Sequence, residues 1–453
     1  MCNLNSLIQR LSTLLVFAIL AENQCFAQRS LAIRGAKLET VSKAGTIEDG
    51  IILIRDGKIE AIGKEVKIPL AAQVIDAKGK TIMPGIVDPY YVVTVGRDAQ
   101  SAGETRTIVI RGQTITVPGG SPSSLTSFTK ISDSIDLDNI DWKAATRSGI
   151  TTMQLVVSGY AQSVIVQPTV KSAQIINPDG KLLVSVTNST QSLDLLRSGL
   201  RAPGSSAGGP PGTGSGPPSP GSGFGRPPGG VRPSPQPPSP QPPSPAPPGN
   251  PPVAANSSVP SAGPTPPVSP TQKLWTDVRE GKSSLFVNLN NAAAILHCVN
   301  ATKEIKQAKL VFIAAGSDLF EAIRDLDPKT HVAILPPRID FVPNTRDRIN
   351  IPKFLSEKEM PFAFSLSLGQ SEFRVQLDTP LFAVSSLVYS GLSRQKAFEA
   401  LTMMPAKLVG VDSEVGSLEV GKKANFLILD GDPFAATTSI QSVFVEGKQI
   451  YEN

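Results

Sequence analysis

Short apolar runs separated by turn dipeptides fill both ends of the chain. Asp56-Gly57 and Glu446-Gly447 each stand between two such runs, and Asp-Gly is typical of a two-residue β-hairpin turn. Neither end has enough strands for a stable sheet of its own. We therefore expect residues 28–85 and 411–453 to pair into one small composite β-sandwich. The apolar runs lie at residues 51–54, 58–62, 425–429, 442–445 and 448–451.

The middle of the chain has a different pattern, in which short apolar strands alternate with helices. For example, a predicted helix at residues 141–148 ends at Gly149, and a predicted strand at 150–157 follows it directly. Repeated units of this kind are typical of a parallel sheet or barrel. Residues 86–201 and 271–410 together have the length of an eightfold β/α barrel, roughly 250 residues. The predicted fold class is α/β, a (β/α)8 TIM-like barrel joined to the composite β-sandwich.

A proline-rich segment interrupts this region between residues 202 and 270. Its 69 residues include 25 Pro and 13 Gly but no Asp, Glu or Lys, and Ser-Pro-Gln-Pro-Pro occurs at 234–238 and again at 239–243. Such a composition offers too little apolar area to offset the entropy of ordering. We expect a disordered insert rich in polyproline II. Two roles stay open for it, a plain spacer and a docking site for a protein partner.

Residues 1–27 have the pattern of a secretory signal peptide. Arg10 precedes an apolar stretch at 11–21, and Cys25-Phe-Ala27 supplies the small residues that a signal peptidase reads. No other stretch approaches the ~20 apolar residues of a membrane span. We expect a periplasmic or secreted protein with no membrane span in the mature chain. Cys298 would then be the only cysteine left, so an internal disulfide is excluded.

Charge and composition narrow the function further. The net charge is +5, but Lys and Arg are scattered rather than gathered in a basic block, which argues against a nucleic-acid partner. The chain holds only two His and three Cys. A multi-histidine metal cage, a Cys/His zinc module and a disulfide framework are therefore hard to build.

Three segments carry a family resemblance. Residues 50–63 contain Arg-Asp-Gly-Lys-Ile-Glu-Ala-Ile-Gly, residues 74–88 end in Pro-Gly-Ile-Val-Asp, and residues 400–430 contain Gly-Ser-Leu-Glu-Val-Gly-Lys. In these motifs the chain resembles the amidohydrolase superfamily of metal-dependent hydrolases, in its imidazolonepropionase-like group. The resemblance implies a β/α barrel with a sandwich built from both termini. It also implies hydrolysis of non-peptide carbon–nitrogen bonds with water activated by one or two divalent metals at the barrel mouth.

The metal ligands of that family are missing from the matching positions. The resemblance places a His-x-His pair where this chain has Tyr90 and Val92, and the fifth-strand His at Asn288. The sixth-strand His would fall near Ala315, and the eighth-strand window 361–370 holds no Asp. We therefore expect no metal, no other cofactor and no catalytic residue of the family type.

The remaining candidates for chemistry have structural interpretations. We expect His297 to be partly buried within a helix, and His331 to lie at the surface or in a turn, at the end of the barrel that active sites do not use. In the matched motif the residue at Asp88 is structural, at the end of a strand. The stretch from Phe364 to Leu368 lacks the leading Gly of a nucleophile elbow.

Tyr90, Asn288 and Asn290 are the predicted binding residues. They replace or neighbour the former ligands with neutral hydrogen-bonding groups. If they line the barrel mouth, they form a polar, uncharged pocket for a small polar ligand. The alternative is a mouth filled by side chains such as Tyr90 and Tyr91.

The sequence thus predicts an exported amidohydrolase-like protein whose catalytic site is degenerate. Two alternatives stay open. One is a non-catalytic envelope module that binds through the barrel mouth or the proline-rich insert. The other is a metal-independent hydrolase that acts through Tyr or Asp residues.

Overall fold

The computed structural model describes most of the chain on either side of the proline-rich segment. The described residues are 30–93, 128–186, 190–201, 269–289, 291–305, 307–314, 316–368 and 380–453, with the backbone of two strands between 105 and 118. The predicted signal peptide and residues 202–268 lie outside this part, so both predictions stay untested. Ser269 and Pro270, predicted to belong to the insert, instead begin a helix. There the Ser269 side chain accepts the amide of Gln272, and the Gln272 side chain accepts the amide of Ser269, each at 3.2 Å.

The described part of the chain consists of the following strands and helices, named in chain order. The strands are β1 (Leu31–Glu39), β2 (Thr46–Arg55), β3 (Lys58–Gly63), β4 (Gln73–Asp76), β5 (Thr81–Pro84), β6 (Ile86–Val92), β7 (Thr105–Ile110), β8 (Gln113–Pro118), β9 (Phe128–Lys130), β10 (Ile150–Val156), β11 (Tyr160–Gln162), β12 (Val164–Pro168), β13 (Ala173–Asn177), β14 (Leu182–Val186), β15 (Ser284–Leu289), β16 (Lys309–Ile313), β17 (His331–Leu335), β18 (Asp340–Phe341), β19 (Arg348–Ile349), β20 (Phe362–Phe364), β21 (Phe426–Leu429), β22 (Ile440–Val445) and β23 (Lys448–Glu452). The α-helices are α3 (Lys143–Arg147), α4 (Thr190–Leu200), α5 (Pro270–Arg279), α6 (Ala292–Thr302), α7 (Gly316–Ala322), α8 (Ile351–Glu357), α10 (Pro380–Tyr389), α11 (Arg394–Leu401) and α12 (Met403–Val409). Within the described ranges, no helix is both long and apolar enough to cross a membrane.

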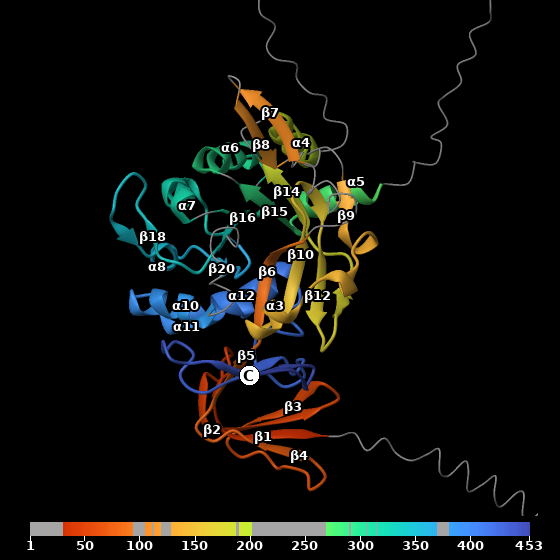
Figure 1. Ribbon diagram of the computed structural model, residues 1–453, viewed down its shortest axis with the longest axis vertical. Helices are drawn as coiled ribbons and strands as arrows, with labels where there is room; N and C mark the ends of the chain where they lie inside the picture. Colours follow the sequence, from red (N-terminus) through yellow and green to blue (C-terminus); the bar gives the residue numbers. More distant parts are fainter. Residues whose placement is uncertain are drawn as a thin grey trace, which may run out of the picture. The chain divides into compact units, whose positions relative to one another are not determined.

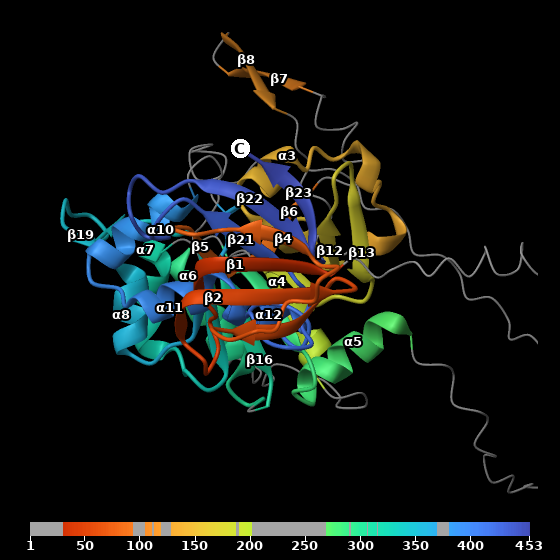
Figure 2. The same cartoon turned by 90° about the horizontal axis from the view of Figure 1, so that it is seen from below.

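The two ends of the chain share one sheet. Its strands lie in the order β23-β22-β21-β5-β1-β2-β3, and β4 pairs with β1. The junction is antiparallel, with Phe426 of β21 opposite Pro84 of β5 and Leu429 opposite Thr81. Figure 2 shows the red N-terminal strands beside the blue C-terminal ones. The pairing of both ends that the sequence predicts is therefore present, while the sandwich itself stays a prediction.

Two hairpin turns meet at this composite sheet. Asp56 and Gly57 have φ of 50° and 75°, and Glu446 and Gly447 have φ of 48° and 69°. Each pair is left-handed, as a type I′ turn requires. A Cβ on Gly57 would lie 3.0 Å from the Cβ of Glu446, so glycine also permits the close approach. Ala424 links the turns, because its amide donates to the Gly57 carbonyl and its carbonyl accepts from the Gly447 amide.

The Pro-Gly motif joins the composite sheet to the next layer. Gly85 lies between β5 and β6, and its amide donates to the Asn425 carbonyl at 3.0 Å. A Cβ on Gly85 would lie 2.2 Å from Oγ1 of Thr151, where no side chain fits. Glycine at this position therefore lets β6 enter against β10.

The middle of the chain forms two further sheets that contain parallel strands. In the larger one, β14, β15, β16, β17 and β20 are parallel in that order, with β11 and β9 beyond β14. In the smaller one, β6 is parallel to β10, and β12 and β13 follow. Helices α6, α7 and α8 connect successive parallel strands of the larger sheet (Figure 1). The described strands thus give a mixed α/β fold, but they do not confirm a closed eight-stranded barrel.

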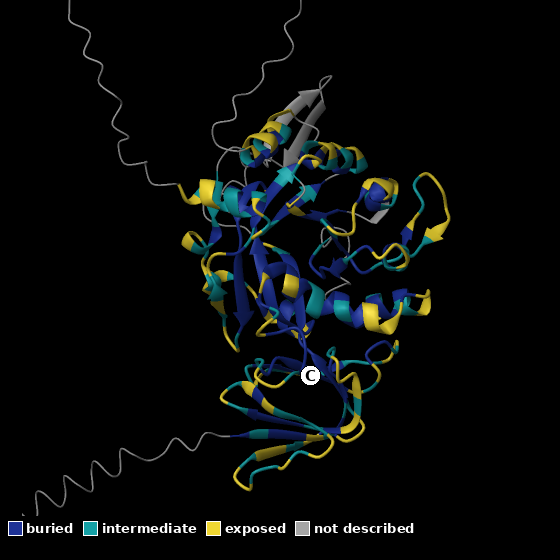
Figure 3. Ribbon diagram, turned by 180° about the vertical axis from the view of Figure 1, so that it is seen from behind, coloured by how far each residue is buried: buried dark blue, intermediate teal, exposed yellow. Residues whose placement is uncertain are grey.

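Both faces of these strands are buried (Figure 3). One apolar cluster combines alternate residues of several strands with helix α12, and we call the strand surface that it covers the inner face. Its strand members include Val87, Leu183, Phe286, Val311, Ile334 and Ala363. The other face packs under the helices through residues such as Leu285, Val287 and Phe312. In the regular strands residue parity therefore decides which side chains reach the inner face. In β6 a register irregularity after Asp88 brings both Val87 and Tyr90 to it.

We predict that Phe426→Ala destabilises both ends of the chain together. The Phe426 ring stacks on Phe444 with centroids 4.6 Å apart, and Phe426 also lies in the strand that pairs with β5. We expect a loss of about 3–5 kcal/mol in the free energy of unfolding, with faster hydrogen exchange of the β5 amides. Tyr389→Ala, at an aromatic residue that is 75% exposed, should change neither. Unchanged exchange in β5 would contradict a shared sheet.

Candidate functional site

Asp88 ties β6 to the segment that follows β20. The residue is fully buried in β6. Its Oδ1 accepts the backbone amide of Tyr90, and its Oδ2 accepts the backbone amide of Ser367, both at 3.0 Å. The hydroxyls of Ser365 and Ser367 donate to the Tyr90 carbonyl. Asp88 is therefore a hydrogen-bonded link between two strands, in the structural role that the sequence analysis expects.

Burial dominates the electrostatics of Asp88. Loss of solvent raises the pKa of its carboxyl group above the usual value, although the hydrogen bonds from Tyr90, Ser365 and Ser367 act in the opposite direction. Both oxygens already accept a backbone amide. The group is thus engaged in holding the strands rather than open to a ligand.

Tyr90 points to the inner face, and Tyr91 does not. Tyr90 belongs to the inner cluster with Phe286 and is 3% exposed. The ring of Tyr91 instead lies 6.4 Å from Trp142 on the helix side. The prediction that Tyr91 helps to fill the mouth is therefore wrong, because neighbouring strand residues face opposite ways. Desolvation raises the pKa of Tyr90 to about 12, which keeps its hydroxyl neutral.

Asn288 also lies on the inner face. It follows Phe286 by two residues in β15, and its register partners are Ser185 in β14 and Ile313 in β16. The side chain is half-buried. Among the described residues, none hydrogen-bonds the amide of Asn288 or the hydroxyl of Tyr90. Asn290, the third predicted binding residue, lies outside the described residues.

Gln154 is an inner-face residue that the sequence analysis missed. Its Nε2 donates to the Pro89 carbonyl at 3.0 Å, and the residue is completely buried. Its Oε1 has no hydrogen-bond partner in the described part of the chain. The available signal was the polar pair Thr152 and Gln154 at alternate positions of an apolar strand. We call Tyr90, Gln154 and Asn288 the inner polar set.

Both histidines differ from their predicted environments. His297 is exposed on α6 rather than partly buried, because the adjacent Cys298 takes the core position of that turn. Burial raises the pKa of Cys298 to about 12, so it stays an inert thiol. His331 is buried rather than at the surface, because it packs on Phe312 with ring centroids 5.2 Å apart.

Comparison with known proteins identifies the family. The Amidohydrolase family profile matches residues 389–451. The imidazolonepropionase of Methylobacterium nodulans is 28% identical over 164 residues, which cover 34% of this chain and 40% of the relative. That of Klebsiella pneumoniae subsp. pneumoniae is 30% identical over 119 residues, or 26% and 29% of the two chains. The crystal structure of an amidohydrolase from Thermotoga maritima matches 93% of this chain and all of that one, with a TM-score of 0.63 and 14% identity.

These matches support the amidohydrolase superfamily. The sequence matches span less than half the length of these curated relatives, and the structural match at 14% identity concerns the fold alone. The activity of the relatives is therefore not carried over to this amidohydrolase-like chain by similarity.

The residues present do not fit the metal centre that this superfamily implies. In the described part of the chain, no three His, Cys, Asp or Glu side chains lie close enough to hold a metal ion. The inner polar set offers a phenol and two amides, which are poor substitutes for imidazole and carboxylate ligands. Both oxygens of Asp88 already accept backbone amides. That the protein holds no metal stays a prediction.

We predict that Asp88→Asn weakens the fold. An asparagine can accept only one of the two amide bonds, so either the Tyr90 or the Ser367 amide is left buried without an acceptor. We expect a loss of about 1–3 kcal/mol in the free energy of unfolding at pH 7, measured by urea titration. Asp76→Asn, at an exposed carboxylate, should have a far smaller effect.

The pH dependence gives a second readout for the same substitution. The folded pKa of Asp88 is raised, so between the unfolded and folded pKa values the folded protein binds more protons than the unfolded chain. The stability that Asp88 contributes must therefore fall as pH rises through that window. The advantage of the wild type over Asp88→Asn should be larger at pH 4 than at pH 7. An advantage that grows with pH would contradict the buried, raised-pKa carboxyl.

Proposed function

We propose that this protein is an amidohydrolase-like barrel without metal-dependent hydrolysis, which binds a small neutral polar molecule at the inner polar set. The observation that carries the proposal is that neutral side chains stand at the inner face where the family resemblance places metal ligands. Tyr90 and Asn288 occupy ligand positions of the family resemblance, and Asp88 is locked between two backbone amides. Among the described residues, a hydrolytic metal would find no suitable donor set there.

The chemistry of the inner polar set supports a neutral ligand. The Tyr90 hydroxyl and the Asn288 amide each can donate and accept, while Gln154 offers a buried acceptor, Oε1. A buried oxygen without a partner costs free energy, and a ligand N–H or O–H would satisfy it. None of the three side chains carries a charge, so none would offset the burial of an ionic ligand.

A metal-independent hydrolase has less support. Tyr90 is too weak an acid to supply a phenolate near neutral pH, because burial raises its pKa to about 12. Asp88 is buried and already accepts two amides. Neither group is poised to activate water.

Location and partners remain part of the proposal. We propose export to the periplasm or outside the cell, supported by the charged and apolar pattern of residues 1–27. We also propose a protein partner for residues 202–270, supported by the repeated Ser-Pro-Gln-Pro-Pro sequence. An envelope binding module would combine these two features.

The first part of the proposal, the absence of a catalytic metal, predicts the metal content of the purified protein. Full-length protein dialysed after purification should carry well under one equivalent of Zn, Mn, Fe, Co or Ni by mass spectrometry. It should not hydrolyse imidazolonepropionate, the compound for which the relatives are named. The triple variant Tyr90→His/Val92→His/Asn288→His restores donors at the matched positions and should bind more zinc than the wild type, whereas Tyr389→His should not. One equivalent of metal in the wild type that is lost on changing Asp88 would overturn the proposal.

The binding component predicts a difference between two adjacent tyrosines. A cyclic urea, 2-imidazolidinone, is a neutral probe with two N–H donors and one acceptor. Tyr90→Phe removes a hydroxyl from the inner face and should weaken binding by about 2–10-fold in calorimetric titration. Tyr91→Phe changes the helix side and should leave the affinity unchanged. Absence of saturable binding, or equal effects of both substitutions, would refute the inner polar set as the site.

A further inference from the structure

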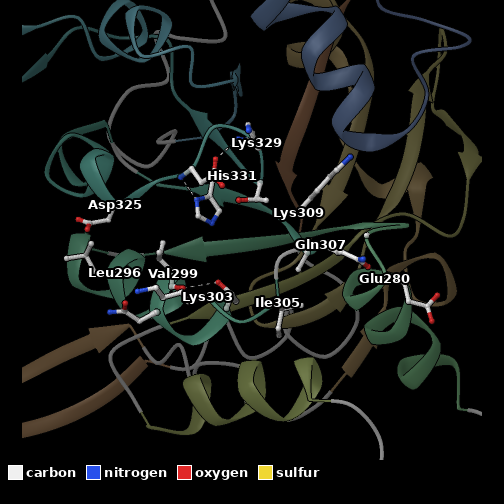
Figure 4. A pocket seen from close by; sticks show the side chains of 16 residues that line it. Glu280, Leu296, Val299, Lys303, Ile305, Gln307, Lys309, Asp325, Lys329 and His331 are labelled. Atoms are coloured by element: carbon white, nitrogen blue, oxygen red, sulfur yellow. Dashed lines mark hydrogen bonds between the residues drawn. The ribbon is translucent and has the colours of Figure 1, made fainter.

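A cavity lies at the amino ends of β15, β16 and β17. It is far along the strands from Asn288, which sits near the carboxyl end of β15. The cavity has a volume of about 990 Å³. Lys309 and His331, the first residues of β16 and β17, line it together with the C-terminal half of α6. We call it the strand-start pocket (Figure 4).

His331 is held rigidly in the wall of this pocket. Its amide donates to the Asp327 carbonyl, and its Nδ1 accepts the Asp327 amide, both at 2.8 Å. The ring packs on Phe312, and the residue is only 7% exposed. Because Nδ1 is an acceptor, the neutral ring carries its proton on Nε2. No described residue accepts that proton, and burial lowers the pKa of the ring below its usual value. His331 therefore offers a fixed neutral N–H donor.

Three lysines line the same pocket as this donor. Lys303, Lys309 and Lys329 line the pocket, and none of them forms an ion pair with a described residue. Figure 4 shows Lys309 and Lys329 on one side of the His331 ring and Lys303 on the other. Lysines without an ion-pair partner among the described residues are available to pair with an anionic group.

Three carboxylates also line the pocket, so its lysines and carboxylates are equal in number. Glu280 pairs with Lys282, with an oxygen–nitrogen distance of 2.6 Å. Asp327 accepts the amide of Lys329 and so belongs to the turn that positions His331. Asp325 lies beside Leu296 at the edge of the pocket (Figure 4). Its charge would repel an anion from that edge and direct the anion towards the lysines.

The floor between these groups is apolar. Leu296 and Val299 from α6, with Ile305 and Ala308 from the following turn, line it. The cavity volume lies within the usual range of small-molecule sites, roughly 300–1,000 Å³, and its lining combines this apolar floor with a polar and charged rim.

We propose that the strand-start pocket binds a small molecule that carries a carboxylate or phosphate group on an apolar body. The anionic group accepts the Nε2 proton of His331 and lies between Lys303, Lys309 and Lys329, while the apolar body covers Leu296 and Val299. This site is independent of the inner polar set, and neither proposal requires the other.

The two histidines of the chain serve as probes of ligand binding. It contains only two histidines, His297 and His331, so the protein labelled with ¹³C at histidine Cε1 gives two signals. His297 is exposed on α6 and does not line the pocket, and a His297→Gln variant assigns its signal. Phenyl phosphate and phenylacetate should shift the His331 signal saturably and leave the His297 signal in place. Phenylacetamide, the neutral analogue of phenylacetate, should bind at least about tenfold more weakly. The ratio of the two anion affinities distinguishes phosphate from carboxylate preference.

Charge reversal completes the test. Lys303→Glu/Lys309→Glu should weaken phenyl phosphate at least about tenfold, with the His297 signal reporting an intact fold. Lys64→Glu, at an exposed lysine outside the pocket, should leave the affinity unchanged. If the double variant unfolds, Lys303→Glu alone is compared with Lys64→Glu. Equal binding of phenylacetamide and phenylacetate, equal shifts of both histidine signals, or no loss of affinity on charge reversal would each overturn the proposal.

Discussion

One buried carboxyl group connects the two parallel layers of this protein. β6 and β20 belong to different hydrogen-bonded sheets, so no ladder of backbone bonds joins them. Asp88 fills that role with one oxygen on the Tyr90 amide and the other on the Ser367 amide. Without it, two buried amides would lack acceptors. The hydroxyls of Ser365 and Ser367, which donate to the Tyr90 carbonyl, strengthen the same link.

A second polar junction attaches the composite sheet to the strands. Lys423 reaches Glu414 at 3.0 Å, Glu446 at 3.1 Å and Oε1 of Gln167 at 3.3 Å. Burial lowers the pKa of this lysine, but the two carboxylates raise it by more, so the ammonium stays charged. Apolar packing therefore stabilises each layer, while specific polar contacts set how neighbouring layers meet. Gln167 takes part in both, since its Nε2 also donates to Thr152 on β10.

Local patterns in the sequence predicted much of the fold, and tertiary contacts explain the remainder. The turn at Asp56-Gly57 depends on the backbone conformation of these two residues, so the sequence alone was sufficient to predict it. Tyr90 and Tyr91 are neighbours in one strand, so they face opposite ways, and Tyr90 is the one on the inner face. Gln154 and His331 were harder, because their environments depend on Pro89 and Phe312, which periodicity cannot place in space.

The shared sheet also has a consequence for synthesis of the chain. β5 lies between β1 and β21, and about 340 residues separate Pro84 from its partner Phe426. At ~5–20 residues per second, a ribosome needs roughly 17–70 s to add them. Throughout that interval one edge of β5 has no strand to pair with, and open strand edges are templates for association with other chains. Until β21 has been synthesised, that edge of β5 is open to such association.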